Sequence, residues 1–336
     1  MQKKQATIKE IAKELNIAVS TVSRALQNNP RIGLRTRERV FEVAKKLNYV
    51  PNPAAILLKK NRTYTIGLLI PSLTEEFFSM AITAIEDVIV DKKISVMISQ
   101  SRDKFDREVQ ALKTFLSSRV DGVIASVSGE TNHYGHFKEL ENYGIPIVFF
   151  DRVPRNLAAH KVRSGVTEGA FEAIEFLVNK KVTKIALING PTNLEASDER
   201  LNGYLTAIEK FNLKIAQSYV KTTDLSKEDT FRKMNQLLDI QDVPEAVLCF
   251  NDYVALYAMQ ACRERGVVPN KDVLFVSFAN LPITGFMDNP PIASVEQFAY
   301  QMGETAANLL LRLINQKEGE SIDYQEITIS TKLIVH

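Results

Sequence analysis

The sequence predicts two folds in one chain, an all-α head followed by a larger α/β body. Residues 1–62 hold 14 Lys/Arg and 4 Asp/Glu, a net charge of +10, whereas the remaining 28 basic and 36 acidic residues give −8. Apolar residues of the head recur at helical spacing, and beyond residue 64 strand-like and helix-like stretches alternate. A small basic block on a larger acidic body indicates a module that binds a polyanion, joined to a body with a different task.

Three short helices are expected in the head. Their apolar stripes lie within Ile8–Leu15, Val19–Gln27 and Val40–Leu47. Thr7 and Glu10 have the spacing of a capping box before the first helix, and only Asn16–Ala18 separates the first two helices. Two short helices joined by a tight turn and braced by a third form a helix-turn-helix. A disordered basic tail would lack these stripes, whereas an ordinary three-helix bundle would share them.

The second helix of the head carries side chains suited to reading DNA. Arg24 can form a bidentate pair with guanine, Ser20 can bond base edges, and Val19 can touch a thymine methyl group. Thr21, Ser23 and the backbone amides at the helix start can bind phosphates. We therefore predict that the head binds double-stranded DNA.

A further short helix is expected at residues 54–60. Asn52 suits its N-cap and Pro53 its first position, but a helix of this length is unstable alone in water. Ile56, Leu57 and Leu58 beside Lys59 and Lys60 have the chemistry of an apolar wedge that enters the minor groove, and the alternative is a linker packed on the body. We assign residues 1–50 to a helix-turn-helix DNA-binding domain and residues 51–63 to a hinge helix and linker.

Residues 64–336 are expected to form the α/β body. The expected strands are Thr65–Ile70, Ser95–Ile98, Gly122–Ser126, Ile145–Phe150, Lys184–Asn189, Ala246–Phe250 and Leu274–Phe278. The expected helices are Phe77–Val90, Phe105–Ser118, Ser197–Phe211, Lys227–Leu238, Tyr253–Arg265 and Phe298–Ile314. Alternation of this kind predicts parallel sheets covered on both faces, and the two sets predict two doubly wound sub-domains.

A ligand site is expected in the cleft between these sub-domains, because such sheets bind ligands beyond the carboxyl ends of their strands. Aromatic faces stack on sugar or base rings, and Asp, Asn and Arg side chains bond hydroxyls or carboxylates. The alternatives are core packing for the phenylalanines and surface ion pairs for the charged residues. The candidates that follow strand ends are Ser72, Phe77, Phe78, Asp151, Arg152, Arg200, Asn251, Asp252, Ala279 and Asn280.

Several stretches carry a family resemblance. TIKEIAKELNIAVSTVSRAL, followed by RERVFEVAKKLNYVPNPAA and TIGLLIP, resembles the LacI/GalR (lactose-repressor) family of bacterial transcription regulators. In the body, PSLTEEFF, FFDR, ERLNGY, FND, SFANLP and NPPIASV resemble the periplasmic-binding-protein-like effector domain of that family. The resemblance runs from about Thr7 to the C-terminus.

The resemblance implies a repressor whose operator affinity is controlled by a sugar-like small molecule bound between the sub-domains. It implies a homodimer, or a tetramer, on a pseudo-palindromic operator, with recognition helices in successive major grooves and Leu58 inserted at the central minor-groove step. The candidate DNA contacts are Thr7, Val19, Ser20, Thr21, Ser23, Arg24, Asn52, Leu58 and Lys59. The effector contacts that it implies are Phe77, Phe78, Asp151, Arg200 and Asp252, with Ser72, Asn251 and Asn280 as further candidates.

The family chain crosses three times between its sub-domains. The resemblance places these crossings near Lys161–Ser164, Ser294–Gln297 and Ser321–Tyr324. Sub-domain one would then hold about 64–162 and 296–322, and sub-domain two about 163–295 and 323–336. A stripe of Ala81, Ile85 and Val88 at helical spacing suits either a dimer partner or the core.

Three positions depart from the family pattern. Ala18 stands where a serine usually caps the recognition helix, and loss of such a cap costs about 0.5–2 kcal/mol. Ile56 replaces a common hinge arginine. Ala279 replaces an aspartate that bonds the effector in many members, so either the ligand's hydroxyl pattern differs there or Asn280 substitutes.

Two other function classes fit the sequence less well. An α/β enzyme is disfavoured because the chain lacks G-x-G-x-x-G, P-loop and G-x-S-x-G motifs. His133 and His136 have the spacing of a metal pair, but two solvated loop histidines are the preferred interpretation. A transport binding protein would need export, which the start of the chain does not indicate. Only Cys249 and Cys262 occur, and no membrane-length apolar run, so we expect a cytoplasmic protein without cofactor or metal.

Overall fold

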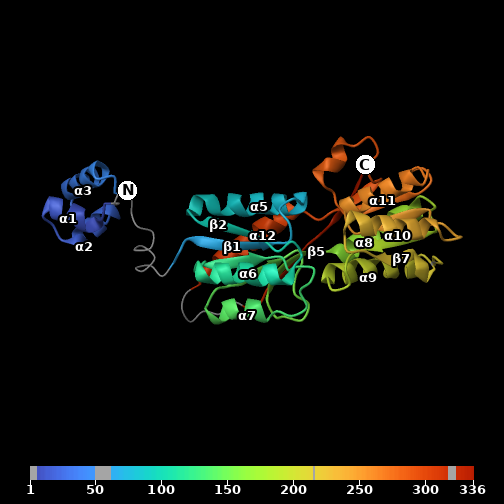
Figure 1. Cartoon of the computed structure of the whole chain (residues 1–336), viewed down its shortest axis with the longest axis horizontal. Helices are drawn as coiled ribbons and strands as arrows, with labels where there is room; N and C mark the ends of the chain where they lie inside the picture. The colour runs from blue at the N-terminus through green and yellow to red at the C-terminus, as the bar shows by residue number, and fades with distance from the viewer. Residues whose placement is uncertain (1–5, 50–61, 215, 317–322) are drawn as a thin grey trace. The chain divides into compact units, whose positions relative to one another are not determined.

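The computed structural model describes residues 6–49, 62–214, 216–316 and 323–336 (Figure 1). It divides into two compact units, Met1–Thr63 and Tyr64–His336, which are described one at a time. The expected hinge helix, with Asn52, Ile56, Leu58 and Lys59, lies outside the described residues. Within the described ranges, every helix falls short of the length or the hydropathy needed to span a membrane.

The first unit is the predicted helix-turn-helix. Its helices are α1 (Ile8–Leu15), α2 (Val19–Leu26) and α3 (Leu34–Lys46). Ile11, Val22 and Val40 meet at the centre, each fully buried, so each helix contributes one apolar face to a shared core. Asn16 ends α1 with φ 51°, a left-handed conformation that Asn tolerates, and this turn sets the start of α2 three residues later.

The first sheet of the body is entirely parallel and has the order β2-β1-β3-β4-β5-β11. Its strands are β1 (Thr65–Ile70), β2 (Ser95–Gln100), β3 (Gly122–Ala125), β4 (Ile147–Phe150), β5 (His160–Ser164) and β11 (Glu326–Ile329). Helices α5 (Glu76–Ile89) and α12 (Ala299–Ile314) cover one face, and α6 (Phe105–Ser117) and α7 (Gly135–Asn142) the other (Figure 1). The single-turn helix η1 is Val90–Lys92.

The second sheet has the order β7-β6-β8-β9-β10-β12, parallel except for β12, which pairs antiparallel with β10. Its strands are β6 (Ile185–Asn189), β7 (Val220–Thr222), β8 (Ala246–Cys249), β9 (Leu274–Ala279), β10 (Ala293–Glu296) and β12 (Lys332–Val335). Helices α8 (Val166–Asn179) and α9 (Glu195–Lys210) pack on one face, and α10 (Lys227–Leu238) and α11 (Asp252–Glu264) on the other. The short turns η2 and η3 are Gln217–Tyr219 and Pro282–Phe286.

Helix α5 packs against α12 at unusually close range. Ala81 and Ile85 are fully buried and Val88 partly buried in the core shared with α12, so the stripe they form belongs to the core rather than to a dimer surface. The approach is closest at Gly303 of α12, where an added Cβ would lie 2.4 Å from the carbonyl oxygen of Ala81. Only glycine permits this spacing.

The chain passes between the two sheets three times. The first passage follows β5 and the second joins β10 to α12, close to the predicted places. The third passage is not near Ser321–Tyr324 as predicted, because β11 still belongs to the first sheet and β12 to the second. The chain therefore crosses at residues 330–331, and residues 323–329 extend sub-domain one instead of sub-domain two.

Candidate functional site

The exposed face of α2 presents the side chains that the sequence assigned to DNA. Val19, Ser20 and Arg24 are exposed, whereas Thr21 and Ser23 are half-buried. The opposite face of the helix is fixed in the core of the head, so these groups lie on a rigid element. Such a face can enter a groove without unfolding anything.

The two helix starts of the motif differ in how they are capped. At α1, the Glu10 N–H donates to Thr7 Oγ1 at 3.4 Å, and the Thr7 N–H donates to Glu10 Oε2 at 2.6 Å, which confirms the capping box. At α2, Ala18 makes no side-chain cap, as its methyl group requires. The first amides of α2 therefore have no side-chain acceptor from Ala18 and can bind a phosphate.

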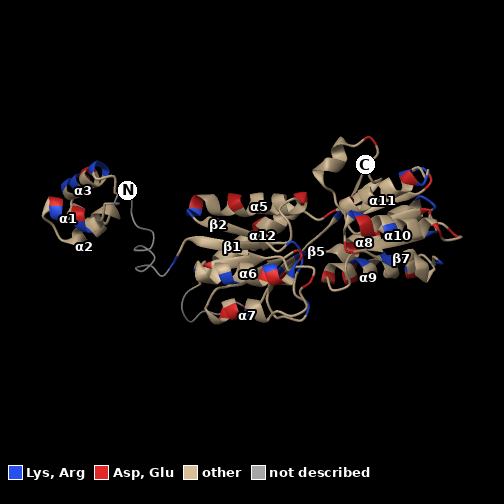
Figure 2. Ribbon diagram, in the orientation of Figure 1, with Lys and Arg blue, Asp and Glu red and all other residues tan. Residues whose placement is uncertain are grey.

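Basic side chains surround this motif. Figure 2 shows Lys and Arg gathered along α3, which contains Arg35, Arg37, Arg39, Lys45 and Lys46. Lys46 forms an exposed ion pair with Glu14 at 2.8 Å, which contributes little to stability. The remaining cations give the head the positive field that attracts a phosphate backbone.

A pocket lies between the two sub-domains of the body, beyond the carboxyl ends of β1, β4, β8 and β9. Its empty volume is about 510 Å³, part of which opens to solvent. Its position is the one expected for open parallel sheets. The lining residues are Glu75, Phe77, Phe78, Asp151, Arg152, Ala196, Arg200, Phe250, Asn251, Tyr253, Ala279, Leu281 and Gln297.

Five of the eight effector candidates line this pocket: Phe77, Phe78, Asp151, Arg200 and Asn251. The other three do not. Ser72 is half-buried beside Thr74, with 2.9 Å between the two hydroxyl oxygens. Asn280 donates its side-chain amide to Glu296 Oε2 at 2.9 Å and does not line the pocket, whereas Ala279 does.

Asp252 is a buried support and not a pocket residue. Its carboxylate accepts hydrogen bonds from the hydroxyls of Ser277 and Ser294 and from the Leu281 N–H at 2.6 Å. Burial raises the pKa of Asp252, while these three donors lower it. The carboxylate holds the loop after β9 against the start of α11, and Leu281 of that loop lines the pocket.

Arg200 is a buried, positively charged residue of the pocket lining. It is only 3% exposed, and its guanidinium lies 4.1 Å from the ring centre of Phe250 and 4.4 Å from that of Phe278. One terminal nitrogen donates to the carbonyl of Ala196 at 2.9 Å, and the other lies 3.5 Å from Gln297 Oε1. Burial lowers the pKa of Arg200 to about 10, so it stays charged at neutral pH.

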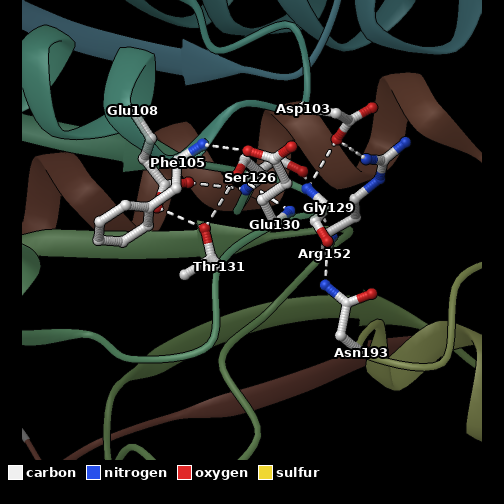
Figure 3. Close-up of polar contacts among 10 residues, drawn as sticks. Asp103, Phe105, Glu108, Ser126, Gly129, Glu130, Thr131, Arg152 and Asn193 are labelled. Atoms are coloured by element: carbon white, nitrogen blue, oxygen red, sulfur yellow. Dashed lines mark hydrogen bonds and ion pairs between the residues drawn. The ribbon is translucent and has the colours of Figure 1, made fainter.

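Arg152 is held in place by a polar network around the loop after β3 (Figure 3). Its Nη1 donates to Asp103 Oδ1 at 2.5 Å, and the same oxygen accepts from the Gly129 N–H at 2.7 Å. The Asn193 side chain, from the other sub-domain, donates to the carbonyl of Gly129. Glu130 fixes the loop further by accepting from the Phe105 N–H at 3.1 Å.

Other contacts also join the two sub-domains. Arg155, which precedes β5, donates to the carbonyls of Thr192 and Leu194 at 2.8 Å and pairs with Asp198 at 2.6 Å. On β5, Arg163 pairs with Glu199 of α9 at 2.7 Å. These contacts stabilise the relative orientation of the sub-domains seen here.

The histidines are not the solvated pair expected from the sequence. His133 is exposed, but His136 is largely buried and its Nε2 lies 2.7 Å from Glu108 Oε1. Glu108, fully buried, also accepts from Thr131 Oγ1 at 2.6 Å. The contact between His136 and Glu108 is a buried structural contact. Within the described ranges, no group of three potential metal-binding side chains occurs.

Sequence reasoning missed several lining residues. Glu75 and Phe250 lie inside the stretches PSLTEEFF and FND that carry the resemblance, so proximity to a strand end could have identified them. Tyr253 is the second residue of α11 and directly follows FND, and Gln297 lies on the second passage between the sheets, within the predicted crossing at Ser294–Gln297. Neither residue was predicted to contact the ligand.

Comparison with known proteins agrees with both units. The head, residues 7–52, matches the family model for bacterial regulatory proteins of the lacI family, and residues 63–335 match that for periplasmic binding proteins and the sugar binding domain of the LacI family. The HTH-type transcriptional repressor CytR of Escherichia coli (strain K12) is 27% identical over 99% of this chain and 96% of its own. The ribose operon repressor of Bacillus subtilis (strain 168) is 30% identical over 93% of each chain.

The fold also matches that of a solved repressor. The structure of the lac repressor dimer bound to operator and an anti-inducer superposes with a TM-score of 0.84 over 98% of both chains, at 24% identity. The helix-turn-helix head, the pocket between two parallel-sheet sub-domains and the two family matches lead to one conclusion. The chain belongs to the LacI family of bacterial regulatory proteins.

Proposed function

We propose that this regulator binds a pseudo-palindromic operator as a homodimer in the cytoplasm, and that a small polyhydroxylated molecule in the pocket controls its operator affinity. The observation that carries the DNA half is the exposed face of α2, backed by a buried core. The pocket at the strand ends, with its aromatic and charged lining, supports the effector half. The ribose operon repressor among its relatives supports a sugar-like ligand.

The head divides its contacts between bases and phosphates. Arg24, Ser20 and Val19 read base edges in the major groove, and Thr21 and Ser23 bind phosphates. Thr7, whose hydroxyl already caps α1, presents the first turn of that helix to the backbone. Asn52, Leu58 and Lys59 complete the interface from the hinge, and their structure is not described.

The first experiment recovers the operator by selection from random DNA and measures binding by fluorescence anisotropy. Arg24→Ala is expected to lose about 1–3 kcal/mol of discrimination between operator and random DNA. Lys45→Ala, on the last turn of α3, is the matched control and should weaken binding to operator and random DNA equally. Equal losses on both DNAs for Arg24→Ala would contradict base reading.

The effector acts by preferring one arrangement of the sub-domains. Arg200 contacts Gln297, which lies on the second passage between the sheets, and the Ser164 hydroxyl at the first passage donates to the Gln297 carbonyl at 3.3 Å. A ligand that binds Arg200 is therefore linked, through Gln297, to two of the three passages between the sheets. Because coupling is reciprocal, operator DNA must change effector affinity by the same factor that the effector changes operator affinity. Calorimetric titrations with and without operator test this equality.

No catalytic step is proposed, and the relatives named above are repressors. Turnover of a bound ligand by the purified protein, followed by chromatography, would overturn this part of the proposal.

A further inference from the structure

The charges that line the pocket do not balance. Two carboxylates, Glu75 and Asp151, face two guanidinium groups, Arg152 and Arg200. Arg152, however, is already paired with Asp103 at 2.5 Å, outside the lining. With Glu75 and Asp151 both ionised, the remaining three groups leave the pocket with one net negative charge.

Glu75 is the carboxylate left open to a ligand. It precedes α5 but does not cap that helix, and in the described part of the chain its side chain has no hydrogen bond or ion pair. Burial raises the pKa of Glu75, opposed by Arg152 and reinforced by Asp103 and Asp151. Burial likewise raises the pKa of Asp151, opposed by Arg152 and Arg200. A cation placed between the two carboxylates would relieve both costs.

The opposite side of the pocket requires an acceptor. Arg200 is almost fully buried, and its Nε has no hydrogen-bond partner among the described residues. A buried guanidinium with an unmet donor favours an oxygen of the ligand. The ring of Phe250 beneath it and that of Phe77 offer apolar surface for a sugar ring.

We propose that the effector is an amino sugar or a close analogue: a polyhydroxylated ring that carries a protonated amine. The ammonium lies against Glu75 and Asp151, and ring or hydroxyl oxygens accept from Arg200. This inference rests on the proposed function of the same pocket. A neutral sugar would leave the negative charge uncompensated when the pocket closes, and a sugar acid would add a second one.

The test compares amino sugars with their neutral parents. Glucosamine, galactosamine and mannosamine are titrated into the full-length protein by calorimetry, beside glucose, galactose, mannose and the three N-acetyl forms, in which the amine is uncharged. At least one amino sugar is expected to bind about 10–100-fold more tightly than its parent and its N-acetyl form, the range of one charge-assisted hydrogen bond. Thermal unfolding at 10 mM ligand provides a second readout.

Two matched variants locate the effect. Glu75→Gln should remove the advantage of the amine, so that the amino sugar binds no more tightly than its neutral parent. Glu76→Gln removes the neighbouring carboxylate, which does not line the pocket, and should retain the advantage. Unfolding curves of both variants establish that they are folded.

The inference is overturned if no amino sugar outperforms its parent, or if Glu75→Gln retains the preference. Neutral or acidic sugars that alter operator binding in such a case would leave the proposed function standing and refute only the amine. Failure of every ligand, of any charge, to alter operator binding would refute the proposed function itself.

Discussion

The close approach of α5 to α12 makes Gly303→Ala a sharp test of the packing in the first sub-domain. The new Cβ would lie 2.4 Å from the Ala81 carbonyl oxygen and 2.9 Å from the Ala81 Cα. Ordinary contact between heavy atoms begins at about 3.5 Å, so the two helices must separate by about 1 Å. Both groups in conflict are backbone or Cβ atoms, so no rotamer change can relieve the overlap.

The sign of the effect distinguishes packing from helix propensity. Overpacking costs about 1–3 kcal/mol, and separation of two helices along their contact places this case at the upper end. Alanine favours a helix over glycine by about 1 kcal/mol. We therefore expect a net loss of about 2 kcal/mol in the free energy of unfolding, where propensity alone would predict a gain.

Scanning calorimetry of the full-length protein measures the loss. For a unit of this size, about 2 kcal/mol corresponds to a fall in Tm of about 4–8 °C. Gly135→Ala, at the start of α7, is the matched control, because a Cβ there meets nothing within 4 Å. A Tm for Gly303→Ala equal to or above that of the control would refute the close packing of α5 on α12.

Three further changes test other features. Ala18→Ser should supply the missing cap of α2 and stabilise the head by about 0.5–2 kcal/mol, read as slower amide exchange in α2; unchanged exchange would mean that the helix start is already satisfied. Asp252→Ala leaves three buried donors without their carboxylate and should cost about 3 kcal/mol in urea unfolding, with exposed Asp288→Ala as the silent control; wild-type stability would show that Asp252 is no support. Burial raises the pKa of Glu199 to about 7, so the stability it contributes is complete below about pH 4.5 and is lost as the pH rises through 7. Wild type should therefore lose up to about 3 kcal/mol more than Glu199→Gln over this window; identical pH profiles would contradict the shift.

The sequence predicted the elements whose patterns are local. The apolar stripes of the head predicted its helices, and the continuous apolar runs predicted the inner strands. Thr7 and Ala18 likewise predicted a capped start for α1 and an uncapped start for α2. Elements beside the passages between sheets were harder to predict. β5, with the sequence HKVRS, and β11, with the sequence EITI, are short and mix polar with apolar residues. Their pairing within the first sheet, β5 with β4 and β11 with β5, makes them strands.

The pocket was predictable to the extent that its residues follow strand ends. Phe77, Asp151 and Arg200 fit that rule and line the pocket. Gln297 was placed at a crossing but not in the pocket, because its contact with the pocket depends on how the two sub-domains meet. Asp252 does not line the pocket, and a sequence does not distinguish a carboxylate that faces a ligand from one bonded to buried hydroxyls.

The last two strands lie in different sheets, with β11 in the first and β12 in the second. During synthesis, neither sheet can therefore reach its full width until residues 326–335 have emerged from the ribosome. The head is complete by Lys46 and can fold while most of the body is still to be translated. A nascent chain would thus carry a finished DNA-binding module long before it had a finished sensor to restrain it.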